Sequence, residues 1–279
     1  MKKVMLITPI AAALSLFLSG TSRAALVLHW ALDETMGTVA ADSSGNGIAG
    51  NWQGTVGSPT WVPAGGVSGG AFSFTGANLD SFITSTLTSV AGTPFSISLW
   101  VKSTSTGNNG LAYLGDGTTG TLYHTVRLTS GAAQATSRNP NEVRAIGAAG
   151  TNNGEWHHLV GVFTSDSERS IYVDGMLQAT NTTNVPALPL NRFGIGALTR
   201  NTPYAPADLF TGQLDDVQVY STPLNQSQIS FMLSNPGVAV PEPTVAVLLA
   251  LGLGVGSIRR RHQAGRIAFP ITDFQGRDQ

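Results

Sequence analysis

The stretch FSISLWVKS, residues 95–103, alternates between two kinds of residue and decides the fold class. Apolar side chains stand at every second position, and mostly polar ones fill the positions between them: Phe95, Ile97, Leu99 and Val101 against Ser96, Ser98, Trp100 and Lys102. A period of two is typical of a β-strand with one face in a core. We therefore predict a half-buried strand here.

Similar short strands follow along the chain: AFSFTG (71–76), WHHLVGVFT (156–164), SIYVDGMLQAT (170–180), RFGIGA (192–197) and GQLDDVQVY (212–220). Within them, Asp174-Gly175 predicts a type I′ hairpin turn. One short helix is expected in PLNQSQISFML, with Asn225 as N-cap and Ile229, Met232 and Leu233 on one face. Because no helices alternate with the strands, the pattern favours an all-β sandwich of two antiparallel sheets.

The amino-acid composition excludes several classes of ligand and site. Charged residues make up 11% of the 279 residues and the net charge is −1, so no electrostatic footprint for nucleic acid exists. The chain has no cysteine, which excludes disulfides, thiolate metal sites and a cysteine nucleophile.

Residues 1–24 have the layout of a signal peptide. Lys2 and Lys3 precede an apolar run, and the small residues Ser22 and Ala24 suit cleavage after Ala24. An uncleaved anchor helix is the alternative. We expect an exported protein whose domain occupies residues 25–235.

The segment 236–263 has a second targeting pattern. An apolar run of sixteen residues lies between Glu242 and Arg259; as a helix it spans roughly 24 Å, short of a hydrocarbon core of roughly 30 Å. Pro241 and Pro243 keep the residues before it extended. By the positive-inside rule the following arginines stay cytoplasmic.

This layout resembles the PEP-CTERM sorting signal: the motif Val240, Pro241, Glu242 and Pro243, an apolar helix at 244–258, and the basic cluster Arg259, Arg260 and Arg261. The resemblance implies processing by an exosortase-type enzyme, only transient membrane contact, and a destination at the cell surface or in the extracellular matrix of a Gram-negative bacterium. The tail at 264–279 departs from the pattern, since such signals normally end soon after the arginines.

The strand motifs, taken in order over residues 26–231, resemble a laminin-G-like, concanavalin A-like jelly roll. The resemblance rests on LVLHWALDET, ADSSGNGIAGNWQG, GVSGGAFSFTG, PFSISLWVKS, EWHHLVGVFTSDSERSIYVDGMLQAT and FTGQLDDVQVYSTPLNQSQI. It implies two packed antiparallel sheets with loops at the rims. Members of the family are mostly binding or adhesion modules, often for carbohydrate, and often carry a structural calcium.

The loop DSSGNGIAGN, residues 42–51, contains the spacing of a dinucleotide fingerprint but starts no helix, which phosphate binding needs. Calcium suits it better, because Asp42 offers a carboxylate and Asn46 an amide oxygen. The resemblance places Asp215 and Asp216 beside this loop, although neighbours on a strand point to opposite faces. Simple Asx turns are the open alternative.

No enzyme motif has its required context. GVSGG, residues 66–70, matches G-x-S-x-G but is followed by a strand rather than a helix. The Glu-x-Asp-x-x-Glu run of jelly-roll glucanases is missing from the sequence. We therefore predict a non-catalytic protein, with a hydrolase as the weakest alternative.

Sugar-binding faces use exposed aromatic rings, and the candidates in loop context are Trp52, Trp61, Tyr113 and Tyr204. The predicted function is an exported binding module for carbohydrate or exopolysaccharide with a structural calcium. The alternative is an adhesion or matrix protein that makes protein contacts only.

Overall fold

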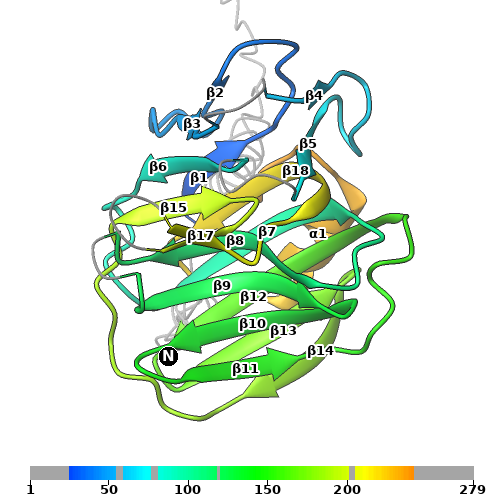
Figure 1. Cartoon of the computed structure of the whole chain (residues 1–279). Helices are drawn as coiled ribbons and strands as arrows, with labels where there is room; N and C mark the ends of the chain where they lie inside the picture. Colours follow the sequence, from blue (N-terminus) through cyan, green and yellow to red (C-terminus); the bar gives the residue numbers. More distant parts are fainter. Residues whose placement is uncertain (1–24, 55–58, 77–80, 118–119, 201–204, 242–279) are drawn as a thin grey trace, which may run out of the picture. The chain divides into compact units, whose positions relative to one another are not determined.

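The computed structural model describes residues 25–54, 59–76, 81–117, 120–200 and 205–241. They form two large antiparallel sheets packed face to face, so the predicted all-β sandwich is confirmed (Figure 1). The predicted signal peptide and the helix at 244–258 lie outside these residues. Within them, no helix has the length and apolar character needed to cross a bilayer.

Eight strands form the first sheet. In spatial order they are β14 (Met176–Asn181), β13 (Glu168–Val173), β12 (Trp156–Ser165), β7 (Phe95–Lys102), β18 (Thr211–Tyr220), β5 (Ala71–Thr75) and β4 (Trp61–Val62), with β1 (Leu26–Trp30) also paired to β18. Strands distant in sequence therefore lie side by side, as β7 does with β18.

Eight strands also form the second sheet. Their order is β11 (Glu142–Ile146), β10 (Ala132–Arg138), β9 (Tyr123–Thr129), β8 (Asn108–Gly115), β15 (Arg192–Ile195), β6 (Ile83–Thr86), β3 (Gly50–Trp52) and β2 (Val39–Ala40). A separate hairpin joins β16 (Leu198–Arg200) to β17 (Ala205–Ala207).

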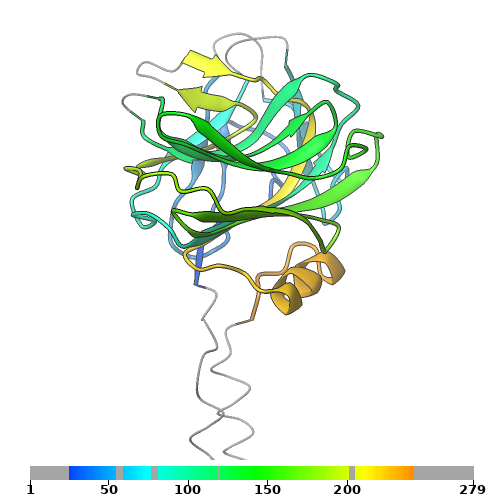
Figure 2. The same cartoon turned by 90° about the horizontal axis from the view of Figure 1, so that it is seen from below.

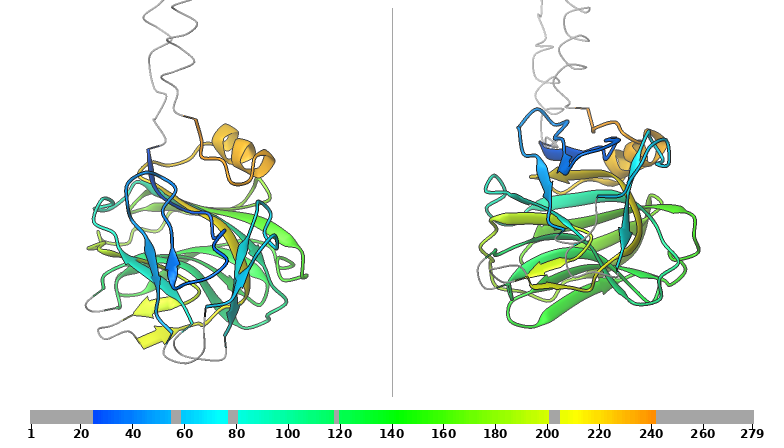
Figure 3. Two further views of the ribbon diagram at one scale, coloured as in Figure 1. Left: turned by 90° about the horizontal axis from the view of Figure 1, so that it is seen from above. Right: turned by 45° about the horizontal axis from the view of Figure 1, so that its top comes forward.

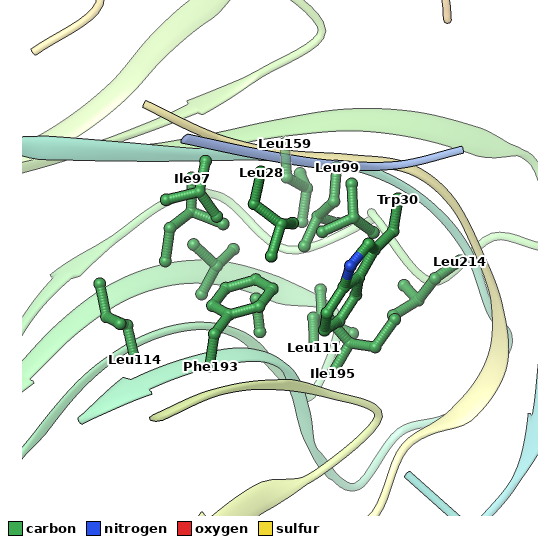
Figure 4. Close-up of a cluster of buried hydrophobic side chains, with 14 of the residues drawn as sticks. Leu28, Trp30, Ile97, Leu99, Leu111, Leu114, Leu159, Phe193, Ile195 and Leu214 are labelled. Carbon is green, nitrogen blue, oxygen red and sulfur yellow. The ribbon is translucent and has the colours of Figure 1, made fainter. Parts of the chain in front are cut away.

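The apolar core lies between the sheets, where side chains from both inner faces meet (Figure 4). Trp30 of β1 is fully buried; its ring centroid lies 5.3 Å from that of Phe193, and its indole N–H donates to the Ile48 carbonyl at 2.8 Å. A Cβ at Gly50 would fall 2.7 Å from the Trp30 ring. Residue 50, at the start of β3, is therefore a glycine because a larger side chain would not fit against this tryptophan.

Strand β7 is buried on both faces, which corrects the prediction of a half-buried strand. Ser96 on its outward face is covered by the chain that leads into the helix: its Oγ donates to the Thr222 carbonyl and accepts from the Leu224 N–H, both at 2.9 Å. The second outward serine, Ser98, is bonded to His158 Nε2 of β12 at 2.8 Å. The period of two shows which residues face the core. It does not show whether something covers the other face.

Helix α1 (Gln226–Ser234) packs on the outer side of the first sheet (Figure 2). Asn225 caps it as predicted, in a capping box completed by Gln228, and Ile229 and Met232 are its buried residues. The predicted hairpin is also confirmed, since Asp174 (φ 49°) and Gly175 (φ 77°) both have positive φ between β13 and β14.

Candidate functional site

The Asp42 loop, residues 42–51, is closed by one carboxylate. Asp42 Oδ1 accepts from the backbone N–H groups of His29 and Ser44 at 3.0 Å, and Oδ2 accepts from the Ser44 hydroxyl and the Ile48 N–H at 2.8 Å. Partial burial opposes ionisation, but these hydrogen bonds outweigh it and hold the pKa of Asp42 below its usual value. Both oxygens are thus used by the loop itself.

Asn46 ties the same loop to β1. Its side-chain N–H₂ donates to the carbonyls of Leu26 at 3.1 Å and Val27 at 3.0 Å. The loop geometry is therefore that of the Asx-turn alternative, with side chains that take the place of missing backbone hydrogen bonds.

Asp215 and Asp216 lie at an irregularity in β18 and have different partners, as the sequence predicts for neighbours on a strand. Asp215 is fully buried; its Oδ2 accepts from the N–H groups of Val67 and Ser68 at 2.6 and 3.0 Å. Burial raises the pKa of Asp215 to about 7.

Asp216 binds a different set of groups. Its Oδ1 pairs with His29 Nε2 at 2.8 Å and accepts from the Gln218 amide at 2.7 Å, and its Oδ2 accepts from the Gly237 N–H at 2.8 Å. Burial alone would raise the pKa of Asp216, but the hydrogen bonds from His29 and Gln218 lower it.

These four residues do not fit a calcium cage as they stand. A calcium ion at Asp42 would have to displace N–H donors from both carboxylate oxygens. In the described part of the chain, no three His, Asp or Glu side chains gather in a way that suits a metal. Calcium remains a prediction from the sequence.

The Trp61 groove is a hollow that can take a ligand. It is an open hollow of about 540 Å³ at one end of the sandwich, lined by Thr35, Met36, Gly37, Thr38, Pro59, Thr60 and Trp61. The Trp61 ring is half-buried, packs edge to face on Phe72 at 4.7 Å, and donates its N–H to the Gly37 carbonyl at 2.8 Å. Two contacts thus fix the orientation of an aromatic ring in a groove.

The other predicted aromatic contacts differ from Trp61. Trp52 packs on the core as Trp61 does, but a Cβ at Gly54 would fall 1.6 Å from the Trp52 ring, so the backbone at Gly54 crowds this ring. Tyr113 is fully buried and donates its hydroxyl to the Asp116 carbonyl at 3.0 Å. Its ring is therefore unavailable for stacking in this conformation. Tyr204 lies outside the described residues.

One polar cluster was not anticipated from the sequence. Buried Arg127 pairs with Glu142 at 3.5 Å and Asp208 at 3.2 Å, and the Tyr123 hydroxyl donates to Glu142 at 2.5 Å. Alternation along β9, where Val126 and Leu128 face the core, indicates that Arg127 faces outward. It does not identify partners that come from other strands.

Part of the predicted sorting signal belongs to the folded body. Val240 is 7% exposed and donates its N–H to the Tyr220 hydroxyl at 3.0 Å, while Pro241 is exposed. Ser221 next to Tyr220 donates its N–H to the Ala25 carbonyl at 3.0 Å, so both ends of the described chain meet on one side of the domain (Figure 3). Ala24, Glu242, Pro243, Arg259, Arg260 and Arg261 lie outside the described residues.

The fold defines a two-sheet sandwich of the lectin and laminin-G class. Residues 75–230, more than half of the chain, match the family model of the concanavalin A-like lectin/glucanases superfamily (Laminin_G_3), and the chain belongs to this family. The resemblance to laminin-G-like domains is thereby confirmed. No curated protein matches the chain.

Solved structures share the fold. Domain 4 of AbnA, a GH43 extracellular arabinanase from Geobacillus stearothermophilus in complex with arabinotriose, superimposes with a TM-score of 0.60 at 21% identity, covering 76% of this chain and all of that domain. A botulinum neurotoxin type C structure, described with cell entry that depends on interaction with two ganglioside molecules, has a TM-score of 0.57 at 12% identity; the match covers 75% of this chain and 51% of the neurotoxin chain. The botulinum neurotoxin type G receptor-binding domain has the same values.

Proposed function

We propose that the chain is an exported, non-catalytic module that binds carbohydrate or exopolysaccharide at the Trp61 groove. The observation that carries the proposal is the Trp61 ring, which is half-buried and fixed in orientation inside an open groove. A rigid aromatic face stacks on a sugar ring with little loss of side-chain entropy.

The relatives support a glycan ligand in general terms. The arabinanase domain is described in complex with arabinotriose, and the neurotoxin study names ganglioside molecules. Both ligands carry sugar rings. This likeness concerns the fold, so the choice of the groove rests on Trp61 itself.

Export and surface display complete the proposal. They rest on the signal peptide at 1–24 and the PEP-CTERM pattern at 240–261, with an exosortase-type enzyme as processing partner. A matrix protein that uses the sandwich only for protein contacts is the competing function, and it requires no sugar-binding groove.

A glycan array with the purified full-length chain tests the proposal. Met36 is 79% exposed on the groove wall, so Met36→Arg obstructs the groove without touching the core. Met176→Arg is the matched control, because Met176 is 69% exposed on the β13–β14 hairpin. We expect array binding that Met36→Arg removes and Met176→Arg retains. Binding that survives both Met36→Arg and Trp61→Ala would exclude this groove as the site.

A further inference from the structure

A second groove, of about 310 Å³, lies at the ends of three neighbouring strands of the first sheet. Ser73 of β5, Gln213 of β18 and Lys102 of β7 line it. Gln213 pairs with Ser73 on one side and with Lys102 on the other, so their side chains form one row on one face of the sheet. We call this hollow the Lys102 groove.

Three polar side chains of the Lys102 groove have no hydrogen-bond or ion-pair partner among the described residues. Among the described residues, no hydrogen bond or ion pair involves the Lys102 ammonium group or the side chains of Ser73 and Gln213. Two other groove hydroxyls are already used: Ser103 donates to the Thr211 carbonyl at 2.6 Å, and Thr211 donates to the Thr75 carbonyl at 3.3 Å. No carboxylate is among the described residues that line the groove. Within the described chain, the Lys102 ammonium group therefore has no counter-charge in the groove.

An aromatic residue extends the row. Trp156 of β12 is the cross-strand partner of Lys102 and is partly exposed. Cross-strand partners share a face of the sheet. An indole, an ammonium group and an amide thus stand next to one another, the combination that holds a sugar ring and a charged substituent.

The two grooves are neighbours. Thr60 lines the Trp61 groove and Ser73 lines the Lys102 groove, and the Ser73 N–H donates to the Thr60 carbonyl at 2.9 Å. Trp61 pairs with Phe72, whose side chain faces the core, whereas Ser73, Gln213 and Lys102 share the opposite face of the sheet. Strand β4 is at the edge of the sheet, so a ligand that occupies both grooves has to pass around this edge.

We propose that the Lys102 groove is a second subsite that takes an anionic sugar, with the carboxylate of a uronic acid residue paired to Lys102. The ligand of the module is then an acidic polysaccharide chain that passes around the edge strand β4 from one groove to the other. This inference rests on the proposed function, because it extends the Trp61 groove. The chemistry follows from the unpaired ammonium group, which forms a charge-assisted hydrogen bond only with an anion or a neutral acceptor that the ligand brings.

Oligogalacturonide and its methyl ester are matched probes, because esterification removes the charge and keeps the sugar ring. With the full-length chain in a calorimetric titration, we expect the acid to bind about tenfold more tightly than the ester at low salt, with the preference shrinking as salt rises. Lys102→Gln should lower acid binding to about the level of the ester, so that the preference for the acid is lost. Arg144→Gln, which removes one positive charge from the second sheet, is the control and should keep the preference.

Lysine chemistry provides a second readout. Lys102 is the only lysine after Lys3 in the sequence, so reductive methylation reports on it directly. The acid probe should protect Lys102 and the ester should protect it less. Equal affinity for acid and ester, or a preference that survives Lys102→Gln, would overturn the subsite and leave the Trp61 groove standing. Absence of binding to any glycan would overturn both.

Discussion

The Asp42 loop and the Lys102 groove are both polar, but they differ in whether their polar side chains have hydrogen-bond partners within the fold. All four hydrogen bonds accepted by Asp42 come from its own loop and from β1. In the groove, the side chains of Lys102 and Gln213 line a hollow and have no hydrogen bond or ion pair among the described residues. Polar groups that a fold needs are paired within it, so the unpaired, accessible ones are the better guide to a ligand.

The largest expected effect belongs to the loop. Asp42→Ala leaves the N–H groups of His29, Ser44 and Ile48 without their acceptor, and we expect a loss of about 2–3 kcal/mol in the free energy of unfolding. Urea titration measures it. Asp42→Asn, which keeps one acceptor oxygen, should lose less. If the urea midpoint of Asp42→Ala equals that of the wild type, the loop is not held by this carboxylate.

The next effect concerns Asp215 and pH. Its folded pKa of about 7 exceeds the ordinary 3.8, so between these values the folded state retains a proton that the unfolded state has lost. This contribution to stability is present at low pH and is lost as the pH rises through about 7. Asp215→Asn should therefore gain stability relative to the wild type as the pH rises through this window.

The wild type has to be compared with Asp215→Asn because two buried histidines change the pH dependence of stability in the opposite direction. Burial lowers the pKa of His124 to about 3 and of His158 to about 4, so their neutral forms favour folding as the pH rises towards 6.5. Both histidines are present in the wild type and the variant, and their contributions cancel in the difference. A stability difference that is constant from pH 4 to pH 7 would contradict the raised pKa of Asp215.

A small effect is expected in the groove. Lys102→Gln removes no hydrogen bond or ion pair between described residues, and we expect a change in unfolding free energy within about 0.5 kcal/mol. The same urea titration checks this. A loss as large as that of Asp42→Ala would mean that Lys102 is part of the fold, and the contrast between the two regions would fail.

The smallest expected effect is that of removing calcium. Because N–H donors occupy both oxygens of Asp42, melting in EDTA and in calcium should give the same midpoint. A bound ion at a hundred times its Kd would instead stabilise the fold by about 2.7 kcal/mol. A shift of several degrees would support the structural calcium predicted from the sequence and would show that the loop rearranges around it.

Much of the fold was predictable because it depends on local pattern. Alternation identified β7, the Asp174-Gly175 pair identified the hairpin, and Asn225 identified the start of α1. The order of the motifs indicated the family. The strand, hairpin and helix signals each lie within about ten residues of sequence, where strand period, turn geometry and capping act.

The binding site is different, because accessibility and pairing depend on neighbours from distant strands. Trp61 and Tyr113 look alike as aromatic candidates in the sequence, yet the first lines a groove and the second is buried beside Tyr123 at 5.6 Å. The sequence by itself determined a two-sheet sandwich of the laminin-G type. Only the tertiary structure decided which polar groups serve the fold and which are left for a ligand, because burial and hydrogen bonding are set by strands that meet across the sheet.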